Sequence, residues 1–263
     1  MISCVCVYFV IFVYFCNVIL TQTHTQMKKT IKLLALVAMG AALTFAACGS
    51  NSKVGGQGSG GAAAAEWVDL GLPSGLLWAK CNLGATKPEE YGDYYAWGET
   101  STKEVYFWET YKYCTAMDEK GWVKTLSKYN TDSEYGTPDH LTTLQPSDDV
   151  ATAKLGNGAR MPTETEWREL IANTTSEWTF ENGVYGRRFT ASNGKSLFFP
   201  AAGYRNGSEL RLAGEYGLYW SSSLDADYPN YAWYFLFRSD YQGVIGNGRQ
   251  RGFSVRAVCA SQN

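Results

Sequence analysis

Few side chains in this sequence have the types and spacing that catalysis or metal binding requires. Beyond residue 26 the single histidine is His140, in the segment GTPDHLTTLQP. An imidazole without neighbours lacks the partners of a general base, and a metal site needs several ligands close together. The serines at 221–223 have no base beside them, so we interpret them as a polar turn rather than as a nucleophile. We therefore expect no catalytic residue, no bound metal and no cofactor.

The adjacent carboxylates Asp148 and Asp149 predict the start of a helix rather than a calcium site. Ser147 before them is a favourable N-cap residue, and Gly156 is a favourable stop. Acidic side chains in the first turn of a helix interact with the positive end of its dipole, which accounts for both residues. The acid-rich loop of a calcium site is missing from this segment.

A second helix is predicted to begin at Thr163, in the segment RMPTETEWRELIANTT. Thr163 and Glu166 have the spacing of a capping box, in which the two side chains satisfy backbone N–H groups of the first turn. The apolar residues that follow share one face of a helix: Trp167, Leu170 and Ile171. We interpret both helices as parts of the scaffold.

Beyond residue 176 the pattern changes from helices to strands. The pairs Asn182-Gly183 and Asn193-Gly194 each separate stretches rich in aromatic and β-branched residues, which is typical of β-hairpins. The segment GFSVRAVC, residues 252–259, predicts a closing strand that is buried on at least one face. Together the patterns predict an α+β fold with two early helices and a twisted antiparallel sheet with long loops.

The segment YWSSSLDADYPNYAWYFLF, residues 219–237, contains eight aromatic rings. It predicts a strand ending at Trp220, a polar loop, and a second strand with at least one face in the core. The loops here mix tyrosine with small polar residues, a composition that suits recognition because tyrosine offers contact area at a low cost in entropy. The candidate ligand-binding residues are Asp225, Asp227, Tyr228, Tyr231, Tyr234, Ser239, Asp240, Tyr241, Asn247 and Arg249.

The first 65 residues have the pattern of an exported, membrane-anchored protein. Residues 27–47 combine a basic start, an apolar stretch and two alanines before Cys48, which predicts a lipoprotein signal peptide and lipidation of Cys48. We interpret residues 1–26 as a start codon assigned too early, and a genuine membrane segment is the alternative. Residues 48–65 are rich in Gly, Ser and Ala and predict a flexible tether, followed by a ligand-binding domain over 66–263.

Removal of the leader would change the charge and leave few cysteines. The three leader lysines would be lost, so that 20 basic and 25 acidic side chains remain and the net charge is about −5. No run of like charge or basic patch appears in the sequence, so nucleic acid is a poor candidate partner. An exported protein can form one disulfide from Cys81, Cys114 and Cys259, and we expect it between Cys81 and Cys259.

Four blocks in one order resemble a known family: WVDLGLPSGLLWAKCNLGATKPEEYGDYYAWGET, RMPTETEWREL, YWSSS and GFSVRAV. Over residues 67 to 259 they resemble the Fibrobacter succinogenes major paralogous domain of Bacteroides-type surface lipoproteins. That family is similar in fold to formylglycine-generating enzymes and to the variable proteins of diversity-generating retroelements. The resemblance implies a C-type lectin-like fold, in which the segment just before the closing strand contacts the ligand.

The resemblance leaves three functions open. The first is a lipid-anchored protein of the outer membrane or cell surface that binds an external glycan or protein, either as a retroelement-diversified receptor or as a fixed relative of one. The second is an oxidoreductase of the formylglycine-generating type, which needs a close pair of late cysteines that bind copper, whereas only Cys259 lies late in this chain. The third is a structural or adhesive surface lipoprotein. We favour the first, without enzymatic activity.

Overall fold

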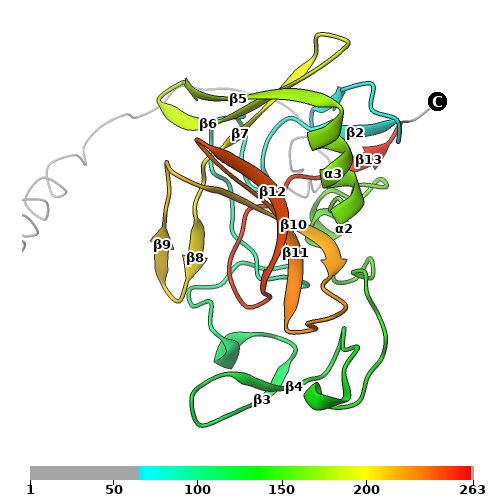
Figure 1. The fold of residues 1–263 in the computed structure, drawn as a ribbon, viewed down its shortest axis with the longest axis vertical. Helices are drawn as coiled ribbons and strands as arrows, with labels where there is room; N and C mark the ends of the chain where they lie inside the picture. The colour runs from blue at the N-terminus through cyan, green and yellow to red at the C-terminus, as the bar shows by residue number, and fades with distance from the viewer. Residues whose placement is uncertain (1–64, 262–263) are drawn as a thin grey trace, which may run out of the picture. The chain divides into compact units, whose positions relative to one another are not determined.

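The computed structural model describes residues 65–261, and the expected signal peptide, the lipidated Cys48 and the tether up to residue 64 lie outside this range. The described chain is mostly β-structure (Figure 1), with thirteen strands, two α-helices and two 3-10 helices. The strands form five small antiparallel sheets of two or three strands each. No helix within these residues is long and apolar enough to cross a membrane.

This architecture shows that the expected α+β class, with two early helices and one twisted sheet in a C-type lectin-like arrangement, is wrong. The two α-helices comprise only six and nine residues, and four strands precede the first of them. Glycines in left-handed conformation, such as Gly183 and Gly194, turn the chain back between neighbouring strands of one sheet. Within the described chain no strand pairing joins the five sheets into one.

The aromatic segment forms a three-stranded sheet in which β11 (Tyr231–Arg238) lies between β10 (Gly217–Leu224) and β12 (Tyr241–Gly248). The serines at 221–223 belong to β10, so the expected polar turn at these positions is wrong. Ser221 tolerates burial because its hydroxyl donates a hydrogen bond of 2.7 Å to the backbone oxygen of Trp233 on the neighbouring strand. The connection between the two strands is therefore shorter than predicted and spans 225–230.

Both faces of β11 contribute to the hydrophobic core. Phe235 and Phe237 are fully buried on one face, and Ala232 and Tyr234 are buried on the other. Two clusters of buried side chains pack on either side of the sheet, one including Trp220 and Tyr234 and the other including Phe235 and Phe237. This double burial explains why the segment is aromatic at consecutive positions instead of alternating with polar residues.

A second three-stranded sheet consists of β5 (Thr174–Glu181), β6 (Val184–Ala191) and β7 (Ser196–Pro200). Both predicted hairpins are confirmed, since the Asn182-Gly183 and Asn193-Gly194 pairs lie in the two connections. The remaining strands form three small sheets: β1 (Trp67–Asp69), β2 (Leu76–Ala79) and β13 (Val258–Ala260); β3 (Cys114–Met117) and β4 (Val123–Leu126); β8 (Tyr204–Asn206) and β9 (Glu209–Arg211). The 3-10 helices are η1 (Trp108–Thr110) and η2 (Ser133–Tyr135).

Helix α3 (Glu164–Ala172) confirms the predicted capping box. The Thr163 hydroxyl accepts a hydrogen bond of 3.3 Å from the N–H of Glu166, and the Glu166 carboxylate accepts one of 2.8 Å from the N–H of Thr163. Trp167 and Leu170 are fully buried. Through them α3 packs against β5 and all three strands of the β10–β11–β12 sheet (Figure 1).

Helix α2 (Val150–Leu155) begins later than the sequence predicts. Its N-cap is Asp149 and not Ser147, and the Asp149 side chain accepts a hydrogen bond of 3.0 Å from the backbone N–H three residues later. Asp148 lies outside the helix, because its carboxylate meets stronger partners than a helix dipole offers. These partners are the ammonium groups of Lys112 and Lys128 and the hydroxyl of Tyr129.

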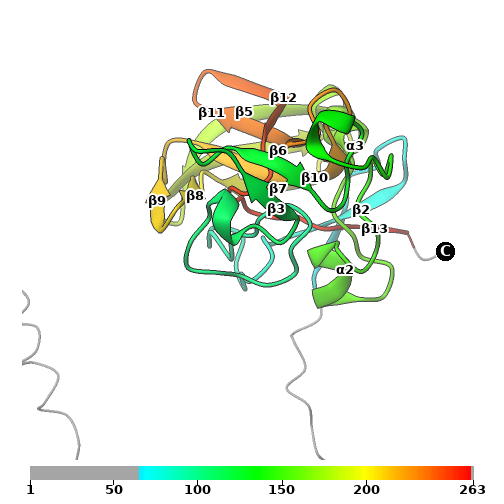
Figure 2. The same cartoon turned by 90° about the horizontal axis from the view of Figure 1, so that it is seen from below.

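The closing segment is buried on both faces, but only its end is a strand. Phe253 to Val258 are all buried, and β13 pairs with β2 on the side of the domain where α2 lies (Figure 2). Cys81, Cys114 and Cys259 are free thiols, so the expected bridge between Cys81 and Cys259 is wrong. Cys259 lies opposite Leu77 in β2, whereas Cys81 lies two residues beyond the end of that strand.

Candidate functional site

The ten predicted ligand-binding residues do not form one site. Asp225, Asp227, Tyr228 and Tyr231 lie around the connection between β10 and β11, and we call these four residues the loop site. Ser239, Asp240 and Tyr241 lie at the β11–β12 turn, at the other end of β11. Because β11 has eight residues, the two ends are about 23 Å apart. Asn247 pairs with Ala232 near the loop site, whereas Tyr234 and Arg249 lie in the core.

Tyr234 is a core residue. Its side chain is buried, and its ring packs against Trp220 and Phe253 at centroid distances of 6.0 and 4.8 Å. Burial raises the pKa of its hydroxyl above the ordinary value for tyrosine. Tyr234 therefore supports the sheet from the face opposite to Tyr231 and has no surface to offer a ligand.

Arg249 is fully buried and holds the loop site in place. Its guanidinium donates hydrogen bonds of 2.7 Å to the backbone oxygen of Pro229 and 2.8 Å to that of Tyr129. The same group lies over the rings of Trp97 and Tyr111, at 5.1 and 5.3 Å from the centroids. Arg249 thus joins the connection between β10 and β11 to a segment 100 residues earlier, and it is a positioning residue.

The loop site presents two tyrosine rings from a short, hydrogen-bonded connection. Tyr228 and Tyr231 are 62% and 38% exposed, and their centroids are 6.3 Å apart with the rings tilted by 41°. The N–H of Tyr231 donates to the oxygen of Tyr228 at 2.7 Å, and the N–H of Asp225 donates to the oxygen of Tyr231 at 3.2 Å. Backbone hydrogen bonds therefore hold the main chain that carries both rings.

A buried carboxylate lies beneath these rings. Asp225 is 8% exposed, and its Oδ1 accepts a hydrogen bond of 3.2 Å from the N–H of Asp227. Burial raises the pKa of Asp225, the carboxylates of Asp227 and Glu164 add to the rise, and backbone N–H groups of the connection oppose it. Glu164 forms an ion pair of 2.7 Å with Arg168, whose guanidinium lies over the ring of Trp233.

The segment around η2 adjoins the loop site, and the sequence carries no signal of this. Thr131 donates a hydrogen bond of 2.7 Å to the backbone oxygen of Ala226, across 95 positions of the chain. Tyr135 is half-buried, and burial raises its pKa, with smaller contributions from Asp132, Glu134 and Tyr231. The Tyr135 ring is therefore close enough to Tyr231 of the loop site to influence it.

The β11–β12 turn is exposed and adjoins aromatic rings that the sequence did not single out. Asp240 forms an ion pair of 2.8 Å with Arg238, and Arg187 donates to the backbone oxygens of Arg238 and Ser239. Trp178 on β5 packs against Phe237 and stacks on Tyr185 of β6. These contacts stabilise the turn but leave its side chains in solvent.

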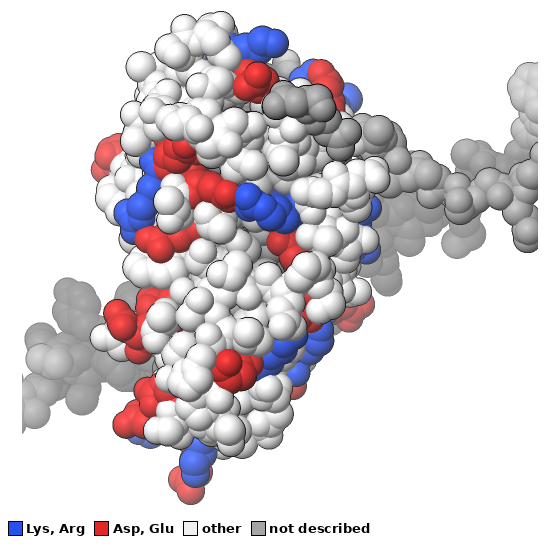
Figure 3. All heavy atoms as spheres, turned by 90° about the vertical axis from the view of Figure 1, so that its right-hand side faces the viewer, with Lys and Arg blue, Asp and Glu red and all other residues white. Residues whose placement is uncertain are grey.

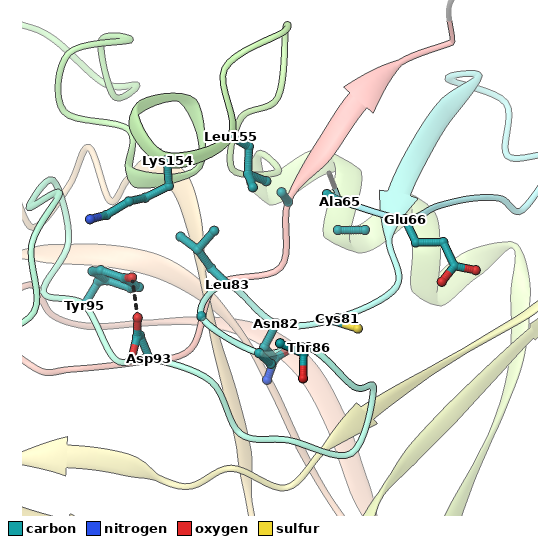
Figure 4. A pocket seen from close by; sticks show the side chains of 14 residues that line it. Ala65, Glu66, Cys81, Asn82, Leu83, Thr86, Asp93, Tyr95, Lys154 and Leu155 are labelled. Carbon is teal, nitrogen blue, oxygen red and sulfur yellow. Dashed lines mark hydrogen bonds between the residues drawn. The ribbon is translucent and has the colours of Figure 1, made fainter. Parts of the chain in front are cut away.

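The described chain also has a cleft of 490 Å³, away from all ten predicted residues (Figure 4). Tyr95 donates a hydrogen bond of 3.0 Å to Asp93 on one wall, and Lys154 of α2 extends toward the same side. Cys81 lines the cleft, but burial raises the pKa of its thiol, which disfavours the nucleophilic thiolate. Among residues 65–261 no group of three His, Cys, Asp or Glu side chains could hold a metal ion.

Acidic and basic groups alternate over one face of the domain. On the face that lies to the right in Figure 1, lysine and arginine are interspersed with aspartate and glutamate (Figure 3). No extended region of one sign appears on this face. Its electrostatic pattern is therefore unlike the basic stripe that a nucleic-acid backbone requires.

Residues 187–258 match a family model described as a domain of unknown function, DUF8237. No curated protein and no solved structure shows significant similarity to the chain. The matching segment begins in β6 and ends at the first residue of β13, and it includes the loop site, the β11–β12 turn and Arg249. In this segment the chain is similar to that family.

Proposed function

We propose that this chain is a lipid-anchored protein of the outer membrane or cell surface that binds an external ligand through the loop site. The observation that carries the proposal is the pair of exposed tyrosine rings, Tyr228 and Tyr231, on a connection fixed by backbone hydrogen bonds. Tyrosine is enriched among the residues that dominate binding energy in protein interfaces. The acidic side chains around the rings supply polar contacts at the rim.

The anchoring of the connection supports binding at this place. Arg249 donates a hydrogen bond to the backbone oxygen of Pro229, and Thr131 donates one to the backbone oxygen of Ala226. These two bonds hold the backbone on either side of Tyr228. A recognition loop that is ordered before binding loses less conformational entropy when the ligand arrives. The β11–β12 turn also exposes polar groups, but its Asp240 is already paired with Arg238.

The cysteines favour binding over the oxidoreductase alternative. A copper-binding cysteine pair requires two thiolates side by side, and Cys259 lies opposite Leu77 in the sheet while Cys81 is four residues further along. Burial raises the pKa of both thiols, which disfavours the thiolate form that a metal needs. We therefore propose a binding protein without catalytic activity.

The proposal is tested by binding of the purified protein to panels of glycans and extracellular proteins. We expect the double variant Tyr228→Ala/Tyr231→Ala to lose the ligand while its melting temperature stays within about 2 °C of the parent. The matched control is Tyr241→Ala, an exposed tyrosine at the opposite end of β11, which should bind normally. Ligand binding that persists in the double variant, or that is lost in the control, would contradict the assignment. Concentration-dependent self-association with no bound ligand would favour the structural alternative.

The idea of a diversified receptor is tested by sequencing the gene's 3′ end in many cells of one strain. We expect substitutions at exposed positions such as Asp227, Tyr228 and Tyr231. Buried Trp220 and Arg249 should stay unchanged, because substitution there would disrupt the core and the anchoring of the connection. Identical sequences in every cell would instead indicate a receptor of fixed specificity.

A further inference from the structure

The cleft of 490 Å³ is an open edge of the hydrophobic core (Figure 4). Ala79, Leu83 and Ala257 line it and belong to the core cluster that includes Trp220. Leu155 of α2 lines the same cleft and is only partly buried, so that apolar surface stays open to solvent. The volume lies within the roughly 300–1,000 Å³ of small-molecule sites. The cleft therefore has the size and the apolar wall of a binding site.

The charged side chains that line the cleft are Glu66, Asp93 and Lys154. Glu66 is compensated, because it forms an ion pair of 2.9 Å with Lys80. Asp93 and Lys154 take part in none of the ion pairs formed among residues 65–261. Asp93 accepts a hydrogen bond of 3.0 Å from the hydroxyl of Tyr95, which leaves its charge in place. One ammonium and one carboxylate are therefore left without a counter-charge on the same side of the cleft (Figure 4).

We propose that this cleft binds a free α-amino acid with a large apolar side chain. The carboxylate of the ligand would pair with Lys154, its ammonium group with Asp93, and its side chain would cover Leu83 and Leu155. An α-amino acid has both charges at one end and the apolar group at the other, which is the arrangement that the cleft complements. Hydrogen bonds between ionised groups are roughly twice as strong as those between neutral ones. This site is separate from the loop site and goes beyond the function proposed above.

Other ligand classes match the cleft less well. A fatty acid would pair with Lys154 but leave Asp93 without a counter-charge, and an apolar amine would do the reverse. A sugar would leave the apolar surface of Leu83 and Leu155 without an apolar partner. A metal ion needs several ligands close together, and no group of three candidate ligands occurs among the described residues.

The first experiment measures binding of L-phenylalanine to the purified protein by isothermal titration calorimetry. Three analogues each lack one feature: 3-phenylpropanoate has no ammonium group, phenethylamine has no carboxylate, and glycine has no apolar side chain. We expect each analogue to bind roughly tenfold more weakly or less, because each loses a charge-assisted hydrogen bond or the buried ring. Equal binding of phenylalanine and either of the two singly charged analogues would overturn the inference.

Two variants test the charges one at a time. Lys154→Gln and Asp93→Asn should each weaken phenylalanine roughly tenfold, and both should keep the melting temperature of the parent because both side chains are exposed. The matched control is Lys124→Gln, an exposed lysine on β4 that does not line the cleft and should bind normally. Unchanged binding in either of the two variants would contradict the assignment.

A second readout shows where the ligand lies. Cys81 lines the cleft, whereas Cys114 lies in β3, and both are partly exposed free thiols. Saturating phenylalanine should slow the alkylation of Cys81 by iodoacetamide and leave that of Cys114 unchanged, as mass spectrometry of the digested protein would measure. Equal rates at Cys81 with and without phenylalanine would overturn the inference. Tyr228→Ala/Tyr231→Ala should bind phenylalanine normally, and a loss there would place the ligand at the loop site instead.

Discussion

Replacing Arg249 with methionine removes the group that holds the loop site. Four oxygens accept hydrogen bonds from its guanidinium: the backbone oxygens of Lys128, Tyr129 and Pro229 and the hydroxyl of Tyr111. Methionine has a similar length but donates no hydrogen bond. Three backbone carbonyls would therefore lose their side-chain donor inside the domain.

The expected loss of stability follows from these carbonyls. Each unsatisfied buried acceptor costs about 1–3 kcal/mol, so that three cost about 3–9 kcal/mol. Arg249→Met also avoids the burial of a guanidinium, which costs several kcal/mol and offsets part of the loss. We expect a net decrease of about 3 kcal/mol in the free energy of unfolding, a large share of the 5–15 kcal/mol that is typical of a domain.

Urea unfolding measures the decrease, and hydrogen exchange over residues 225–231 shows where it acts. We expect faster exchange in this connection, because its anchor to Pro229 is lost. Arg249→Lys is the comparison: one ammonium group cannot reach four acceptors spread around a planar fork, so it should recover less than half of the loss. An Arg249→Met variant within 1 kcal/mol of the parent, with unchanged exchange in the connection, would refute the reasoning.

Three further predictions rest on single contacts. Burial raises the pKa of Asp148, but hydrogen bonds from neighbouring lysine and tyrosine side chains outweigh it and hold this pKa well below its usual range. Its contribution to stability is therefore present above a pH of about 4 and lost as the pH falls toward the lowered pKa, and Asp148→Asn should flatten the acid side of a pH–stability curve. Thr163→Ala should lower the free energy of unfolding by about 1 kcal/mol through the lost cap, and an unchanged urea midpoint would contradict this. Because Cys81 and Cys259 are free thiols, dithiothreitol should not change the melting temperature, and a decrease would indicate a bridge.

The features that the sequence predicted correctly depend on neighbours along the chain. The capping box of Thr163 and Glu166 acts within one helical turn, and the Asn182-Gly183 turn requires backbone conformations that these two residues adopt readily. The exposure of Tyr228 follows in the same way from a short polar connection between two strands. Local rules suffice at these places because the interacting groups are only a few residues apart.

The wrong predictions concern competition between local preferences and distant partners. Ser147 is a good N-cap residue, yet the helix starts at Val150, because Asp149 caps it and lysines far away in sequence bind Asp148. The number of sheets, and hence the fold class, depends on which strands find each other, and periodicity does not encode this pairing.

The sequence by itself determined the candidates for ligand recognition, namely tyrosine and small polar side chains in the last part of the domain. Only the tertiary structure decided which of them can act together. The length of β11 separates Tyr231 from Tyr241, and the packing of Trp97 and Tyr111 encloses Arg249. Residue types specify the chemistry that is possible, whereas burial and distance, which arise only when remote segments pack, select the groups that reach a ligand.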